Sequence, residues 1–211
     1  LSVWLSWTDP DEDYSVALYW TNGEASSRVA TSERYAGDRP TERIVTRVGP
    51  GSYYLVVRGP ANATGDSLRL VSPTHQLQRY RPRGSVVAPA TAREVVGVGA
   101  YDRDADRVPL YSSRGPTADG RRGVDLVGPA DPTVADVPDR FTGSSAAAAY
   151  VAGVAALAVD ADSDAPPSVV ERRLRQAATD VGPNGTDVHS GAGLVDAVTA
   201  ARAANRTSVR P

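Results

Sequence analysis

The feature that most constrains this chain is an uncharged stretch of mostly small residues that runs from Gly143 to Val159. It is too long for a strand and is rich in alanine, the residue with the highest intrinsic preference for the helix. Its small side chains would let a helix lie close against neighbouring elements. The stretch therefore predicts a buried helix with Gly143 at its start.

The second half of the chain alternates short apolar runs with helical patterns. Val95–Gly99 and Val124–Val127 have the composition of buried parallel strands. Pro167 stands where the first turn of a helix tolerates proline, and Leu194–Ala204 predicts a third helix. The expected buried face of the helix after Pro167 consists of Val170, Leu174, Ala177 and Ala178. Strands that alternate with helices predict an α/β fold with a parallel sheet.

Residues 1–80 follow a different pattern, in which apolar and other residues alternate along short segments. Val3, Leu5 and Trp7 form one such segment, and an Asn22-Gly23 pair suits the tight turn of a hairpin. Further short strands with turn residues between them predict an antiparallel β-sandwich or jelly roll. The sequence thus predicts three parts: a β-sandwich over 1–80, an α/β domain over 85–205 and a frayed tail over 206–211.

Composition excludes several classes of function. The 211 residues include no cysteine and no lysine, so thiol and lysine nucleophiles and cysteine metal clusters are excluded. The formal net charge of −2 gives no reason to expect nucleic acid or an anionic membrane as partner. No apolar run in the sequence is long enough to span a bilayer.

Ser145 is the candidate catalytic residue, because the predicted helix places it in the first turn. A helix N-terminus offers unpaired backbone N–H groups and the positive end of the helix dipole. Both would stabilise an oxyanion that develops beside a serine hydroxyl. The residues alone leave a second interpretation open, in which the serine merely caps the helix.

The segment Phe141-Thr-Gly-Ser-Ser-Ala-Ala-Ala-Ala-Tyr-Val-Ala-Gly153 closely resembles the nucleophile motif of the subtilisin-like serine proteases (subtilases), Gly-Thr-Ser-x-Ala-Ala-Pro-x-Val-Ala-Gly. Gly143 and Ser145 match the leading glycine and the nucleophile. The chain departs from the family pattern at three positions, where Ser144 replaces threonine, Ala149 replaces proline and Tyr150 replaces a histidine that is not the catalytic one.

Four further segments resemble the same family in the same order, so the resemblance covers about residues 85 to 200. They are Pro89–Ala100, Tyr111–Pro116, Val124–Pro129 and Gly191–Ala197. The resemblance implies the C-terminal half of a three-layer α/β protease domain that hydrolyses polypeptides, is secreted and needs no cofactor. It also implies that Gly143 and Ser144 lie in the oxyanion and substrate region beside Ser145.

The β-rich half also has a counterpart. Asp13–Tyr19 and Gly51–Val57 resemble the pre-peptidase C-terminal type of β-sandwich that accompanies secreted proteases. This implies that residues 1–80 form an insertion within the catalytic domain. The strand-like opening at Leu1 further suggests a piece cut from a larger protein.

The resemblance leaves two catalytic groups unaccounted for, because the triad aspartate and histidine of subtilases precede the serine. The two histidines, His75 and His189, do not stand in the family's His-Gly-Thr-His context. We therefore expect this chain to be inactive alone and to need the missing N-terminal half as its partner. The alternative is a binding module in which a β-sandwich is fused to a degenerate, non-catalytic protease remnant.

Metal sites are weakly indicated. Aspartates alternate in two loops, and such spacing can supply calcium ligands, although the glycine and distal glutamate of an EF-hand do not follow the first set. These residues are Asp9, Asp11, Asp13, Asp102, Asp104 and Asp106. The sequence therefore predicts no metal site and leaves calcium as an open alternative.

Overall fold

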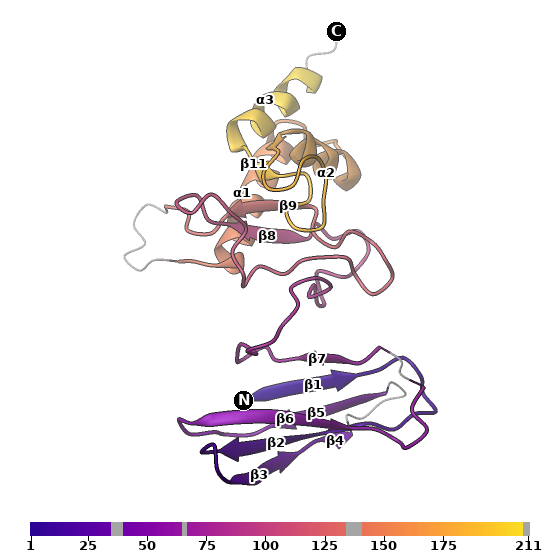
Figure 1. Cartoon of the computed structure of the whole chain (residues 1–211). Coiled ribbons are helices and arrows are strands. Elements are labelled where there is room, and N and C mark those ends of the chain that lie inside the picture. The colour runs from indigo at the N-terminus through magenta and orange to yellow at the C-terminus, as the bar shows by residue number, and fades with distance from the viewer. Residues whose placement is uncertain (35–39, 65–66, 134–140, 209–211) are drawn as a thin grey trace. The chain divides into compact units, whose positions relative to one another are not determined.

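The computed structural model describes residues 1–34, 40–64, 67–133 and 141–208. The chain divides into two compact units, Leu1–Tyr80 and Arg81–Pro211, each built from one continuous stretch of sequence. Figure 1 shows strands alone in the first unit, and helices together with strands in the second.

The first unit contains two antiparallel sheets. One has the strand order β4-β5-β1-β7 and the other has the order β3-β2-β6. The strands are β1 (Ser2–Ser6), β2 (Ser15–Thr21), β3 (Ser26–Thr31), β4 (Glu33–Arg34), β5 (Thr41–Val45), β6 (Ser52–Arg58) and β7 (Arg69–Val71). The first sheet is closed by the pairing of β1 with both β5 and β7, strands that follow it by about 40 and 65 positions.

The core of the first unit follows from the alternation in its sequence. Val3 and Leu5 of β1 are fully buried, and they cluster with Val16 and Leu18 of β2. Because side chains of a strand point alternately to its two faces, this pattern places one apolar face of each sheet in a shared core. Within that core the Trp7 and Tyr14 rings meet edge to face, with centroids 5.4 Å apart.

The second unit contains one four-stranded sheet in the order β10-β11-β9-β8. Its strands β8, β9 and β11 are parallel, and β10 is antiparallel to β11. The elements are β8 (Val98–Tyr101), β9 (Leu126–Pro129), α1 (Ser144–Asp160), α2 (Pro167–Gln176), β10 (Ala178–Thr179), β11 (Leu194–Val195) and α3 (Ala197–Ser208).

The two faces of this sheet are covered differently. Leu126 and Val195 pack with side chains of all three helices in one apolar cluster. On the opposite face, Tyr101 and Val127 pack with residues such as Val86 and Val124, which lie outside the helices. Within the described part of the chain, helices therefore cover one face of the sheet and non-helical segments cover the other.

Helix α1 lies unusually close to strand β9. A Cβ atom added at Gly128 would lie 2.8 Å from the backbone oxygen of Ala147 and 3.1 Å from Cγ2 of Val151. Ala147 and the facing Ala100 of β8 are completely buried. The small residues of the Gly143–Val159 stretch thus allow the close packing that the sequence predicts.

The C-terminal part differs from the prediction of one helix over Leu194–Ala204. Leu194 and Val195 form β11, and α3 begins only at Ala197 and continues to Ser208. Gly193 brings the backbone so close to Thr179 that an added Cβ would lie 2.0 Å from its carbonyl oxygen. The expected tail from residue 206 is thus helical to Ser208, and its last residues, 209–211, lie outside the described residues.

Candidate active site

Ser145 is the second residue of α1, and its side chain is exposed. The cap of the helix is Gly143, whose φ of 96° lies in the left-handed region that favours glycine. The N–H of Gly143 donates a 2.7 Å hydrogen bond to the carbonyl of Ala130, just after β9. No side chain caps the helix, so Ser145 does not act as the simple N-cap that the sequence left open.

The start of α1 suits an anion. The first turn of a helix carries backbone N–H groups without acceptors inside the helix, and the helix dipole adds partial positive charge there. No acidic residue lies in the first turn of α1 to offset this charge. Ser144 and Ser145 are both exposed at this end of the helix.

The hydrogen bonds of the two histidines in the described structure do not involve Ser145. His75 belongs to the first unit, is exposed, and its Nδ1 lies 3.0 Å from the hydroxyl of the adjacent Thr74. His189 lies in the loop before β11, where its backbone N–H donates to Asp187. Among the described residues, no side chain forms a hydrogen bond with the Ser145 hydroxyl.

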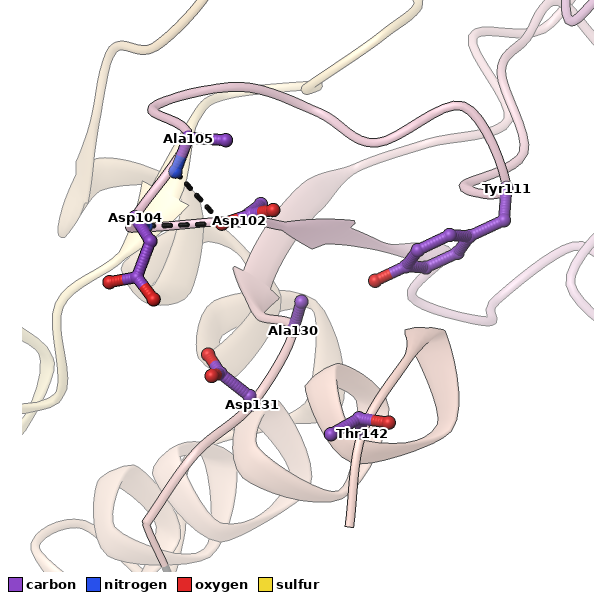
Figure 2. A pocket seen from close by; sticks show the side chains of 7 residues that line it. All are labelled: Asp102, Asp104, Ala105, Tyr111, Ala130, Asp131 and Thr142. Carbon is purple, nitrogen blue, oxygen red and sulfur yellow. Dashed lines mark hydrogen bonds between the residues drawn. The ribbon is translucent and has the colours of Figure 1, made fainter. Parts of the chain in front are cut away.

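A pocket of about 680 Å³ lies beside the N-terminal end of α1. It is lined by Asp102, Asp104, Ala105, Tyr111, Ala130, Asp131 and Thr142. Figure 2 shows the Tyr111 ring with its hydroxyl end pointing into the pocket, and the carboxylates of Asp104 and Asp131 across from it in that view. In the sequence, the alternating spacing of Asp102 and Asp104 indicates only a possible calcium site, and no pattern there identifies Asp131 as a site residue.

The pocket is electronegative. Partial burial raises the pKa of Tyr111 above its ordinary value, and the negative charges of Asp102 and Asp131 raise it further. Asp102 is held in place, since one of its oxygens accepts the backbone N–H groups of Asp104 and Ala105 at 3.1 and 3.0 Å. The hydroxyl of Tyr101, the residue before Asp102, donates to Asp106, which raises the pKa of Tyr101 to about 12.

Two limits apply to other kinds of site in the described ranges. No three histidine, aspartate or glutamate side chains there are placed to hold a metal ion together. No helix there has both the length and the apolar character needed to cross a membrane.

The first comparison with known proteins is with solved structures. The CspB protease of Clostridium perfringens matches all of this chain with a TM-score of 0.62 and 17% identity, and 53% of that chain is covered. At this identity the likeness concerns the fold. Fervidolysin from Fervidobacterium pennivorans, a keratinolytic enzyme related to subtilisin, matches 55% of this chain at 27% identity (TM-score 0.46, 20% of its own chain).

MycP1 from Mycobacterium smegmatis matches 54% of this chain at 26% identity, with a TM-score of 0.44, and 31% of its own chain is covered. The present chain therefore spans about half or less of the length of these structures.

The second comparison is with models of protein families. The model of the subtilase family, peptidase S8, matches residues 53–193. That range contains the last two strands of the first unit and nearly all of the second unit up to β11. It also contains the Gly143–Gly153 motif with Ser145. The chain belongs to the subtilase family.

Proposed function

We propose that this chain is the nucleophile-bearing part of a serine endopeptidase, and that Ser145 attacks the carbonyl carbon of a peptide bond. The observation that carries the proposal is the exposed Ser145 hydroxyl in the first turn of α1, within the motif that the subtilase family shares. Gly143 sets the backbone at this turn, and Ser144 lies on the substrate side of it.

The reaction is an acyl transfer in two halves. The Ser145 oxygen forms a bond to the carbonyl carbon while its proton passes to a base. The oxyanion that results is stabilised by the N–H groups at the start of α1. The base then gives the proton to the leaving amine, the C–N bond breaks, and water hydrolyses the ester that remains on Ser145.

We further propose that the base, a histidine, and the aspartate that orients it come from a segment outside these residues. The support is an apolar surface that lacks cover in the described structure. Seven residues of α1 with apolar side chains or none are exposed, namely Ala148, Ala149, Ala152, Gly153, Ala156, Leu157 and Val159. A helix that is apolar all round normally lies inside a protein, so this face fits a partner segment.

The sheet offers a second place for that segment. Strand β8 is the outermost strand of the sheet and pairs with β9 on one side. An edge strand presents unpaired N–H and C=O groups that can pair with a further strand. In this proposal the N-terminal half of the protease domain extends the sheet at β8 and covers α1, and the first unit is an insertion between the halves.

The proposal is tested by labelling with a fluorophosphonate probe, read by intact mass. We expect the 211-residue chain alone to remain unlabelled, because a serine without a base is a weak nucleophile. In subtilisin, loss of the histidine lowers turnover by about a million-fold. The product of the complete coding sequence should be labelled once, at Ser145.

Two variants control the test. Ser145→Ala should abolish labelling of the complete product, whereas Ser168→Ala, which removes an exposed serine of α2, should leave it labelled. If the complete product is not labelled, the chain is a non-catalytic remnant that binds, and the proposed activity is wrong. Labelling of the 211-residue chain alone would place a base within these residues and would refute the external segment.

A further inference from the structure

The pocket lined by Asp102 and Asp131 lies at the edge of the sheet where the parallel strands end. Strand β8 ends at Tyr101, directly before Asp102, and β9 ends at Pro129, directly before Ala130 and Asp131. In open α/β sheets, ligands bind in the crevice outside the carboxyl ends of the strands. The position of the pocket therefore suits a binding site.

The pocket is also close to Ser145 along the chain. Thr142 lines it and precedes Ser145 by three residues. Consecutive Cα atoms are 3.8 Å apart, so the Cα atoms of Thr142 and Ser145 are separated by at most about 11 Å. A polypeptide whose carbonyl lies at Ser145 can thus place a neighbouring side chain in the pocket.

The lining selects for positive charge. It includes three aspartates and no basic residue. Among the described residues, neither Asp102 nor Asp104 forms an ion pair with an arginine, although Arg103 and Arg107 flank them in sequence. A neutral or acidic side chain that entered the pocket would displace water from these carboxylates, and no favourable charge interaction would offset that loss of hydration.

Tyr111 adds a flat surface to this charge. The residue is 61% exposed, and its hydroxyl end points into the pocket (Figure 2). A guanidinium group can stack on an aromatic ring and at the same time donate paired hydrogen bonds to a carboxylate. The volume, about 680 Å³, falls within the range of about 300–1,000 Å³ that is usual for ligand pockets.

We propose that the pocket formed by Asp102, Asp104, Tyr111 and Asp131 binds a basic side chain, arginine foremost, of the polypeptide close to the bond that Ser145 attacks. The inference rests on the proposed function for its substrate, and it assigns that substrate a specificity. Asp102 and Asp104 are the specificity-determining carboxylates, and Tyr111 forms the wall on which the guanidinium stacks.

The test measures binding separately from catalysis, in the 211-residue chain that carries Ser145→Ala. Isothermal titration calorimetry compares the peptide Gly-Gly-Arg-Gly-Gly, blocked at both ends, with the same peptide containing citrulline, the neutral analogue of arginine. We expect the arginine peptide to bind about tenfold more tightly, the factor that one charge-assisted hydrogen bond supplies. The preference should fall to about twofold or less when Asp102→Asn and Asp104→Asn are added.

A matched control is Asp160→Asn, which removes an exposed aspartate of α1 outside the pocket and should leave the preference unchanged. Far-UV circular dichroism of each variant checks that the helices are retained. Equal affinity for the two peptides, or a preference that survives in the double variant, overturns the inference. Binding of calcium that the arginine peptide cannot displace overturns it as well.

These outcomes are distinguishable from a failure of the proposed function. A complete product that is not labelled at Ser145, together with an intact arginine preference, would refute the peptidase and leave a site for basic peptides. A labelled Ser145 without the preference would leave the peptidase and refute the pocket's role.

Discussion

At the scale of single residues, the contact between Gly128 and Ala147 sets the distance between helix α1 and the sheet. The backbone of α1 lies so close to β9 that a methyl group at Gly128 would meet a carbonyl oxygen, an atom that cannot turn aside as a flexible side chain can. Ser145 belongs to α1, so a shift of the helix would also move Ser145.

We predict that Gly128→Ala lowers the free energy of unfolding of the second unit by about 1–3 kcal/mol, the usual cost of overpacking. Gly153→Ala is the matched control, since an added Cβ there meets nothing within 4 Å. It should raise the free energy of unfolding by about 0.5–1 kcal/mol, because alanine favours the helix. Chemical denaturation followed by circular dichroism at 222 nm measures both, and changes of the same sign would contradict the prediction.

Some residues of the candidate site can be predicted from the sequence, and others cannot. The place of Ser145 in the first turn of a helix could be predicted because its motif is continuous, and α1 begins at Ser144. The pocket was missed because its lining comes from separate segments around residues 102, 111, 130 and 142. The parallel pairing of β8 with β9 brings these segments together. Parallel strands are joined by long connections, so the sequence of neither strand shows which strand it will pair with.

At the scale of elements, α1 is a helix with an apolar side chain on every face. Val151 and Val154 are buried against the sheet and the other helices, while Leu157 is 51% exposed on another side. An exposed apolar face of this kind promotes association with other molecules.

We predict that the isolated 211-residue chain self-associates through this face and that Leu157→Glu reduces the association. Glutamate forms helices about as readily as leucine, so the variant should keep the helix. Val198→Glu on α3 is the control, because Val198 is similarly exposed, at 56%, but lies on another helix and should change little. Size-exclusion chromatography with light scattering measures the mass, and a monomeric wild-type chain would contradict the prediction.

The elements also show which patterns could be detected in the sequence. Strands β1 and β2 were predicted because their apolar residues alternate in the core. Strand β3 was not, because five of its six residues are exposed and it therefore has no apolar face to detect. Strand β11 was taken for part of a helix because Leu194 and Val195 run into the apolar sequence of α3 with Asp196 alone between them.

At the scale of the whole molecule, the two units have separate cores and carry different spectroscopic probes. All three tryptophans, Trp4, Trp7 and Trp20, lie in the first unit, and all three helices lie in the second. Tryptophan fluorescence therefore follows the unfolding of the first unit, and helical circular dichroism follows that of the second.

We predict that the two units unfold in separate transitions. Leu174→Ala removes a side chain that is 1% exposed in the second unit. It should lower the free energy of the circular dichroism transition by about 2–5 kcal/mol and leave the fluorescence transition in place. Leu5→Ala in the first unit should do the reverse. Transitions that shift together in either variant would show that the units unfold as one.

The continuity of each unit in the sequence has a consequence for the order of events at the ribosome. The last strand of the first unit is β7, which pairs with β1, so its sheets can close once residues up to Val71 have emerged. Synthesis of the 65 residues from Arg81 to Ser145 takes roughly 3 to 13 seconds at about 5–20 residues per second. Strand pairing in small β domains is complete in milliseconds to seconds. The nascent β-sandwich can therefore be fully folded before the segment with Ser145 is translated.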